Sequence, residues 1–202
     1  MRTERGLDRL VTFLDAVVAI AITLLVLPLI DLLAQRPQGE ELGALLGGHP
    51  GQFGSFALSF VVIARIWLSH HRLVERVGSY DEPFLLVNLV WALTVVVLPF
   101  STQVIAEYST ERLSVGLYIG TIAVNSACGT ALTLLLRRRP GLRRAGVAPG
   151  DPDPTAALVT TALVLLALVL GVALPAVNFY ALLLLLLTGP LVRLVARVRS
   201  RG

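Results

Sequence analysis

The sequence has few of the residues that soluble enzymes and metal-binding proteins use. It contains one cysteine, Cys128, which excludes an internal disulfide and a metal cage built from cysteines. It has no Gly-x-Ser-x-Gly elbow, no phosphate-binding loop and no pair of carboxylates within one apolar run. These absences give no support to a hydrolase, and we expect that the protein is not an enzyme.

Charged residues are also few, and basic residues outnumber acidic ones. Charged residues make up 15% of the chain, lysine is absent, and all seventeen basic residues are arginine. A net charge of +4 would suit a nucleic-acid partner, but apart from Arg65 the arginines lie at or beyond the ends of apolar runs. In that position they indicate membrane topology, so we expect a lipid bilayer as partner and no nucleic acid.

The apolar residues gather in long runs. They form 55% of the 202 residues, and the mean hydropathy is +0.79. Because about 20 apolar residues in a helix cross a bilayer core, the runs predict an all-α integral membrane protein with one domain, 1–202. Six transmembrane helices are expected, at about 7–33, 53–74, 84–106, 113–136, 155–174 and 176–195.

The arginine distribution predicts the orientation. An even number of spans puts both termini on one side, together with the turn at 75–83 and the linker at 137–154. These segments and their flanks hold most of the arginines, which places both termini of a multi-pass cell-membrane protein in the cytoplasm. No internal repeat is present, so any pore symmetry must come from several subunits.

The first span, residues 7–33, combines an apolar core with two acids. No charge occurs from Ala16 to Ile30, yet Asp15 stands at its entrance and Asp31 at its exit. Pro28 predicts a bend, because it cannot donate to the carbonyl four residues earlier. A helical wheel puts a stripe on one face, which is either a packing seam or a pore lining: Ala16, Ile20, Thr23, Leu24, Leu27 and Asp31.

Polar side chains also occur in the second and third spans. Arg65 lies in mid-span and needs a partner or water. His70 and His71 are adjacent, so they point about 100° apart on a helix and cannot chelate one metal ion as an i,i+4 pair would. We therefore expect no metal site.

The first span carries a recognisable motif. Its segment Arg9-x-x-x-Phe13-Leu14-Asp15, followed by a long apolar run, resembles the transmembrane protein 175 family, the lysosomal and prokaryotic potassium channels. The signature of that family is Arg-x-x-x-Phe-Ser-Asp, so Leu14 replaces a serine here. The resemblance continues through four further segments: Leu58-Ser59-Phe60-Val61-Val62-Ile63, Trp67-x-x-His70-His71-Arg72, Asn88-Leu89 and Leu98-Pro99-Phe100.

The resemblance implies a fold and a function. The fold is six helices per chain, with four chains as a homotetramer around a central pore lined by the first helix. Carried onto this sequence, the hydrophobic pore layers fall at Ile20, Leu24 and Leu27, and Thr23 forms the adjacent hydroxyl layer. These residues belong to the stripe that the wheel identifies, which favours the pore over the seam.

The implied function is a leak-type channel with weak selectivity for potassium. The sequence lacks the Thr-Val-Gly-Tyr-Gly segment that supplies carbonyl oxygens in ordinary potassium channels. A constriction of aliphatic side chains would take the place of that filter. We expect no cofactor, and potassium as the permeant ion.

Two acids of the first span allow two interpretations each. We expect Arg9, Phe13 and Asp15 to lock this span to the second or third, through Trp67, His70, His71 or Asn88. Alternatively, Asp15 faces the pore mouth and attracts cations. Asp31 is expected to form an outer ring of carboxylates at the pore mouth, or else to lie among the lipid headgroups.

Other functional classes remain open on sequence alone. A proton-coupled secondary transporter would use ionisable groups at mid-membrane, which Arg65 matches, but such carriers often contain paired repeats. A proton-permeable channel is a second alternative to a potassium channel. A membrane scaffold that conducts nothing would leave the ordered motifs of the first three spans unexplained.

Overall fold

The computed structural model describes residues 4–35, 37, 39, 41–108, 111–145, 154–174 and 178–199. Within these ranges the chain is nearly all helical and has no strand, so the predicted all-α class is confirmed. The elements in order are α1 (Glu4–Leu24), α2 (Leu27–Gln35), α3 (Leu42–Gly48), α4 (Pro50–Val74), α5 (Glu82–Glu107), α6 (Arg112–Arg138), the 3-10 turn η1 (Pro140–Leu142), α7 (Thr155–Ala173), the 3-10 segment η2 (Asn178–Leu187) and α8 (Thr188–Arg199).

The protein is a multi-pass membrane protein. Five helical stretches of the described ranges are long and apolar enough to cross a bilayer: Arg5–Gln35, Pro50–Val74, Glu82–Glu107, Arg112–Arg138 and Thr155–Ala173. They coincide with the first five expected spans. The sixth, 176–195, begins outside the described residues and continues into η2 and α8, where Ala181–Leu194 is a shorter apolar segment. The count of six therefore stays a prediction.

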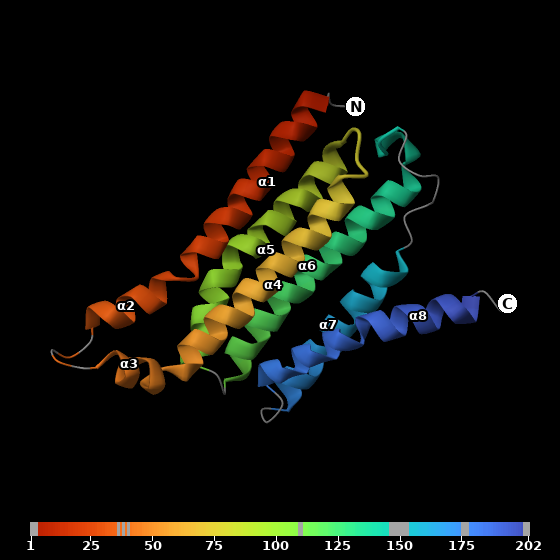
Figure 1. Ribbon diagram of the computed structural model, residues 1–202. Helices are drawn as coiled ribbons and strands as arrows, with labels where there is room; N and C mark the ends of the chain where they lie inside the picture. The colour runs from red at the N-terminus through yellow and green to blue at the C-terminus, as the bar shows by residue number, and fades with distance from the viewer. Residues whose placement is uncertain are drawn as a thin grey trace.

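Helix α5 is the centre of the bundle. It packs against α1, α4 and α6, and α6 in turn packs against α7. Figure 1 shows α1 on one side of these central helices, with α7 and α8 on the other. The buried side chains of α5 recur at helical spacing along its length: Phe84, Trp91, Val95, Leu98 and Ile105.

Hydroxyl and amide groups connect the central helices across their apolar contacts. Thr102 of α5 donates to Ser59 of α4 at 2.7 Å, and Ser59 lies 3.1 Å from the Tyr118 hydroxyl of α6. Nearer the other end, the Asn125 amide donates to the Thr94 hydroxyl at 2.7 Å. A buried polar group without a partner is costly in a membrane, so these bonds fix which faces of α4, α5 and α6 meet.

The first span is not a single helix. Helix α1 ends at Leu24, and α2 begins at Leu27 in a different direction (Figure 1). Between them the amides of Leu25 and Val26 bond carbonyls three residues back, both at 3.3 Å, which is 3-10 geometry. The bend expected at Pro28 is confirmed, but the expectation of one continuous helix is corrected. Since Pro28 has no N–H, the regular helical ladder cannot pass this point.

The turn between α4 and α5 docks on the chain that follows α6, at the end of the bundle that carries the N-terminus (Figure 1). We call residues 75–81 and 139–145 the end cap. The Gly78 amide donates to the Leu142 carbonyl and the Arg144 amide to the Arg76 carbonyl, both at 2.9 Å. A Cβ at Gly78 would lie 2.9 Å from the Arg144 Cα, so glycine allows this close approach.

Asp81 connects the end cap to α5. Its carboxylate accepts the Phe84 amide at 3.0 Å, as an N-cap does, and forms an ion pair with Arg139. Burial alone would raise the pKa of Asp81, but the Phe84 amide and the Arg139 guanidinium outweigh it and lower the pKa below its ordinary 3.8.

We predict that Asp81→Ala destabilises the protein by about 1 kcal/mol at pH 7, the usual value of an N-cap. Because the folded pKa is depressed, this stabilisation is complete above the ordinary pKa of 3.8 and is lost as the pH falls through the lower folded pKa. Thermal unfolding of the purified protein at pH 7 and pH 3 measures the difference.

Asp81→Asn is the matched control, because asparagine caps helices as well as aspartate does but carries no charge. We expect it to retain most of the stability at pH 7 and to show no loss on acidification. A melting temperature of Asp81→Ala equal to that of the unmodified protein at pH 7 would contradict the role given to this cap.

Candidate functional site

Helix α1 has one packed face and one open face. Leu14, Val18 and Ala21 are buried against the bundle, with exposed fractions of 1%, 3% and 2%. On the other side Ile20 is 60% exposed and Leu24 is 40% exposed. The division between the two faces follows the helical repeat: once α4 and α5 cover one side of α1, the spacing of the residues sets which side chains stay uncovered.

The part of the expected stripe that belongs to α1 lies on the open face, and Leu27 follows the break at the start of α2. Ile20, Thr23, Leu24 and Leu27 are all exposed in the single chain. Exposure is shared by other apolar side chains, such as Leu93 at 61% on α5, which a bilayer would cover. The stripe differs from those in having a hydroxyl, that of Thr23, and a helix break between Leu24 and Leu27.

Thr23 and the break give this face some polarity. The Thr23 hydroxyl donates to the Ile20 carbonyl at 2.8 Å, and its oxygen can still accept a hydrogen bond or contact a cation. The break at Leu25–Val26 follows directly and loosens the backbone beside Leu24. Thr23 and the break therefore put oxygen atoms next to an otherwise aliphatic surface.

Asp31 is exposed on α2, beyond the break. The helical wheel that put Asp31 in line with Ile20 assumes one unbroken helix, and the structure corrects that assumption. The position of Asp31 relative to the stripe depends on how α2 is tilted, rather than on the spacing in the sequence.

Asp15 contacts the second span. The Trp67 indole N–H of α4 donates to the Asp15 carboxylate at 2.9 Å. This carboxylate is thus directed toward α4 inside the chain, which favours the locking interpretation over a ring of Asp15 side chains at a pore mouth. A charged acceptor makes such a hydrogen bond stronger than a neutral pair.

Around this contact lies an aromatic cluster of α4 and α5. The His70 Nε2 lies 2.7 Å from the Asn88 side-chain oxygen, and the His70 ring stacks on Trp91 with centroids 3.9 Å apart. The Asn88 amide in turn donates to the Phe84 carbonyl at 2.8 Å. Trp67, which bonds Asp15, also faces His71 with ring centroids 5.3 Å apart.

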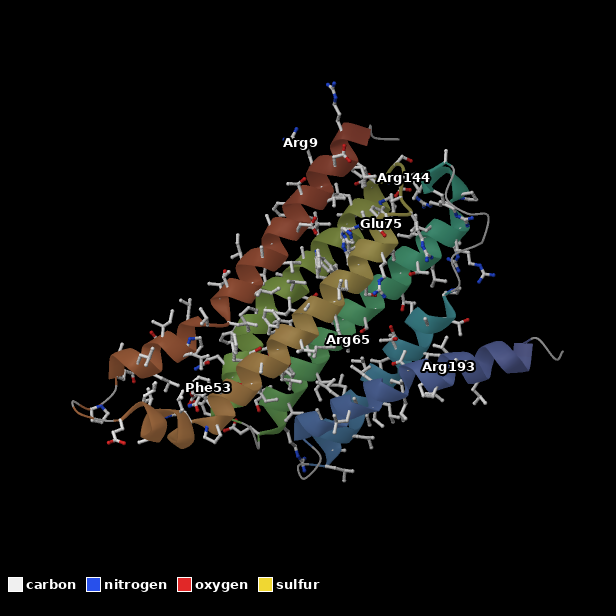
Figure 2. All side chains as sticks on the ribbon, viewed as in Figure 1. Arg9, Phe53, Arg65, Glu75, Arg144 and Arg193 are labelled. Carbon is white, nitrogen blue, oxygen red and sulfur yellow. The ribbon has the colours of Figure 1, made fainter. Side chains whose placement is uncertain are left out.

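The structure thus brings Asp15, Trp67, His70 and Asn88 together but leaves two signature residues outside. Phe13 is 52% exposed, and Arg9 is exposed and points away from the other helices (Figure 2). Within the described residues Arg9 makes no hydrogen bond or ion pair. Arg9 and Phe13 are therefore not part of a lock within one chain.

Leu14 fills the position where the family signature has serine. It is 1% exposed and packs in the hydrophobic core between α1 and the bundle. The substitution therefore exchanges a hydroxyl for apolar packing at a buried place, and the neighbouring Asp15 retains its bond to Trp67.

The sequence gives no indication of how the first turn of α1 packs. A Cβ on Gly6 would lie 2.9 Å from the Tyr80 hydroxyl, so the first turn of α1 rests on the end cap. Arg65, at mid-length on α4, is exposed (Figure 2). In the part of the chain that the structure describes, no three His, Cys, Asp or Glu side chains come together as metal ligands would.

Comparisons with family models and with individual proteins point to the same family. The model of the family described as endosomal/lysosomal potassium channel TMEM175 matches residues 9–99. A protein of Streptomyces collinus named a potassium channel is 35% identical over 103 residues, which cover 51% of this chain and 49% of that protein. A second potassium channel, from Chamaesiphon minutus, is 35% identical over 125 residues and 59% of each chain.

A mammalian relative matches more weakly. The mouse protein named endosomal/lysosomal proton channel TMEM175 is 24% identical over 131 residues, 62% of this chain and 26% of its own length. The chain thus aligns with about half of the length of the bacterial relatives and a quarter of the mouse protein.

Two solved structures share the fold over nearly the whole chain. The crystal structure of a lysosomal potassium-selective channel TMEM175 homologue from Chamaesiphon minutus has a TM-score of 0.66 at 24% identity, covering 98% of this chain and all of that one. The crystal structure of the potassium channel MtTMEM175 has a TM-score of 0.62 at 17% identity, covering 96% and 94%.

The resemblance to the TMEM175 family is thereby confirmed in sequence over residues 9–99 and in fold over nearly the whole chain. The family is one of ion channels and not of enzymes, in agreement with the sequence analysis.

We predict that the Asp15–Trp67 bond contributes about 1 kcal/mol to stability. Trp67→Phe keeps an aromatic ring but removes the N–H donor, and Asp15→Ala removes the acceptor. A double-mutant cycle on thermal unfolding isolates the pair, and the double variant is expected to lose about 1 kcal/mol less than the sum of the two single losses. Losses that simply add would mean that the bond contributes nothing.

Proposed function

We propose that four copies of this chain form a leak-type cation channel with weak selectivity for potassium, whose pore is lined by the open face of α1. The observation that carries the proposal is that face: Ile20, Thr23 and Leu24 are exposed, as is Leu27 at the start of α2, while the opposite side of α1 is packed in the bundle. The family resemblance supports it, since the bacterial relatives are named potassium channels.

The need for several chains follows from symmetry. One chain offers one candidate stripe, and a single stripe closes into a pore only when rotation repeats it. In a homotetramer the four α1 helices would surround the axis, and Arg9 and Phe13, which are exposed in the single chain, would lie near a neighbouring subunit. Arg9 and Phe13, which take no part in the contact between Asp15 and Trp67, would then lie at an interface between subunits.

The gate in this proposal is hydrophobic. Rings of Ile20, Leu24 and Leu27 would narrow the pore with aliphatic groups that offer water no hydrogen bond, so water leaves the constriction and ions cannot follow. Four Thr23 hydroxyls beside these rings would give a partly dehydrated cation some oxygen contacts. With no carbonyl cage, discrimination rests on how readily an ion sheds water, which favours potassium only weakly.

In this proposal the break between α1 and α2 is the hinge of the gate. The backbone between Leu24 and Leu27 has the longer 3-10 bonds, at 3.3 Å, and Pro28 restrains the ladder from re-forming. A small tilt of α1 against α2 at this point would widen or narrow the Leu24 ring without unfolding either helix. The Asp15–Trp67 bond would hold the opposite half of α1 still.

Topology and location complete the proposal. The end cap and the N-terminus lie at one end of the bundle (Figure 1), and arginine is concentrated there, which supports a cytoplasmic position for the N-terminus. With six spans, the C-terminus would lie on the same side. In a cell membrane, α2 and the exposed Asp31 would then lie at the outer mouth. Four carboxylates at that mouth would concentrate cations.

Proton permeation is the second candidate function. It is favoured by the name of the mouse relative, an endosomal/lysosomal proton channel. A proton-coupled carrier has less support, because Arg65 is exposed on α4 and no paired repeat is present.

The experiment that tests the proposal is single-channel recording of the purified, reconstituted chain in opposing potassium and sodium gradients, with mass measurement in detergent. We expect unitary currents, a reversal potential shifted modestly toward potassium, and the mass of a tetramer. Saturable flux without unitary currents would indicate a carrier, and reversal that follows the pH gradient would indicate protons. Absence of any flux, or monomers alone, would overturn the proposal.

We predict that Ile20→Asn wets the constriction, raises leak current several-fold and lowers the preference for potassium, because the ion then passes with more of its water. Ile22 is the matched control on the same helix. It is half-buried and packs against the core of the chain, so Ile22→Asn should reduce expression or assembly without changing selectivity. Both variants are compared by recording and by yield. The reverse pattern would place the pore face half a turn away.

We predict that Asp31→Asn lowers conductance at low ionic strength and changes it little in concentrated salt. At about 0.01 M salt the screening length is about 30 Å, so a ring of carboxylates attracts cations to the mouth, whereas about 1 M salt shortens it to about 3 Å. Conductance is measured in both conditions. Equal conductance of the variant and the unmodified protein in dilute salt would remove Asp31 from the mouth.

A further inference from the structure

A cavity of about 620 Å³ opens in the end cap, away from the open face of α1. It is lined by Leu7 and Asp8 of α1, by Gly78 and Ser79 of the α4–α5 turn, and by four residues that follow α6: Gly141, Arg143, Arg144 and Ala145. Its volume lies within the range of sites that bind small ligands, about 300–1,000 Å³. Three segments that are distant in sequence therefore line one cavity that is open on one side.

The backbone around the cavity is well fixed. Gly78 and Ser79 both donate their amides to the Leu142 carbonyl, at 2.9 and 3.3 Å, and the Ser79 hydroxyl donates to the Gly141 carbonyl at 3.0 Å. These donors are used within the protein. A ligand in the cavity must therefore be held mainly by side-chain charge.

The charge comes from two arginines in the lining. The Arg143 guanidinium donates to the carbonyls of Leu136 and Arg137 at 2.9 and 3.0 Å, which anchors a positive charge at the end of α6. Arg144 is pinned by its backbone amide to the Arg76 carbonyl, and its side chain is exposed. Figure 2 shows Arg144 at this end of the bundle. One acid, Asp8, also lines the cavity and opposes an anion there.

The cavity also lies at a particular depth. It is built from residues just past the ends of α4 and α6 and before the start of α5, which are three of the membrane-crossing helices. The ends of such helices lie at the level of the lipid headgroups. Basic pockets on the side of the membrane that carries the excess of arginine are suited to the phosphates of anionic lipids.

We propose that this cavity, which we call the cap site, binds a phosphate group, with Arg144 as the direct contact and Arg143 as a fixed neighbouring charge. The ligand is an anionic phospholipid headgroup, and free phosphate is the soluble source of the same chemistry. A metal cation is disfavoured, because the two arginines outnumber the one carboxylate in the lining. A bound headgroup would bridge the first turns of α1 and the end cap.

The test measures binding to the purified full chain in neutral detergent micelles, by native mass spectrometry and by the shift of the melting temperature. The probes are phosphatidylglycerol, phosphatidylcholine and inorganic phosphate. We expect phosphatidylglycerol to bind and to stabilise the protein, more weakly as salt is raised, and phosphatidylcholine to bind less. If inorganic phosphate alone stabilises as much at equal concentration, the cap site is confirmed with the soluble ligand as its source.

Three variants locate the binding. Arg144→Ala should weaken phosphatidylglycerol binding about tenfold, the loss of one charge-assisted hydrogen bond at a partly exposed site. Arg112→Ala removes an exposed arginine from the opposite end of α6 and should leave binding unchanged. Asp8→Asn removes the opposing charge and should strengthen binding. Equal weakening by Arg144→Ala and Arg112→Ala, or no binding of any probe, would overturn the proposal.

Discussion

Inside a bilayer no water is present to bond a polar group, and this constraint accounts for most of the fold. Within the described residues, no buried side-chain nitrogen or oxygen lacks a hydrogen-bond partner. Hydroxyls return to carbonyls one turn earlier, as Thr121 does to Leu117, or cross to the next helix, as Thr102 does to Ser59. Because each bond has a definite direction, the polar groups select one rotation of each central helix among the many that apolar packing would tolerate.

The same constraint explains why α1 differs from its neighbours. Its packed face is mostly apolar, and the Trp67 indole N–H bonds the Asp15 carboxylate there. Its other face has the Thr23 hydroxyl and a backbone that leaves regular helical bonding at Leu25. Such a weakened ladder is tolerated at membrane depth where it lines water or is covered by protein. In contact with lipid the same arrangement would be costly, which is a physical reason to place this face toward an aqueous pore.

The sequence predicted the parts of this structure that depend on local pattern. Long apolar runs located the five long spans, Pro28 located the bend, and the helical repeat separated Ile20 from Ile22. For the contact that Asp15 makes with the second or third span, the sequence predicted only a set of candidate partners. Asp15 had four possible partners in the sequence: Trp67, His70, His71 and Asn88. A helical wheel gives the face of a residue, but it gives neither the side-chain rotamer nor the offset between two helices along their axes, so it could not select Trp67.

The contacts that sequence reasoning missed join segments far apart in the chain. Nothing local to Gly78 indicates that Arg144 will lie against it, and glycine in a short turn has several ordinary explanations. The linker arginines were interpreted as a signal of topology, which requires only that they lie on one side of the membrane. Once the α4–α5 turn docks on them, Arg143 and Arg144 also line a cavity with Asp8. Orientation of the chain and recognition of a phosphate can thus use the same charges, because both depend on where those charges lie relative to the membrane surface.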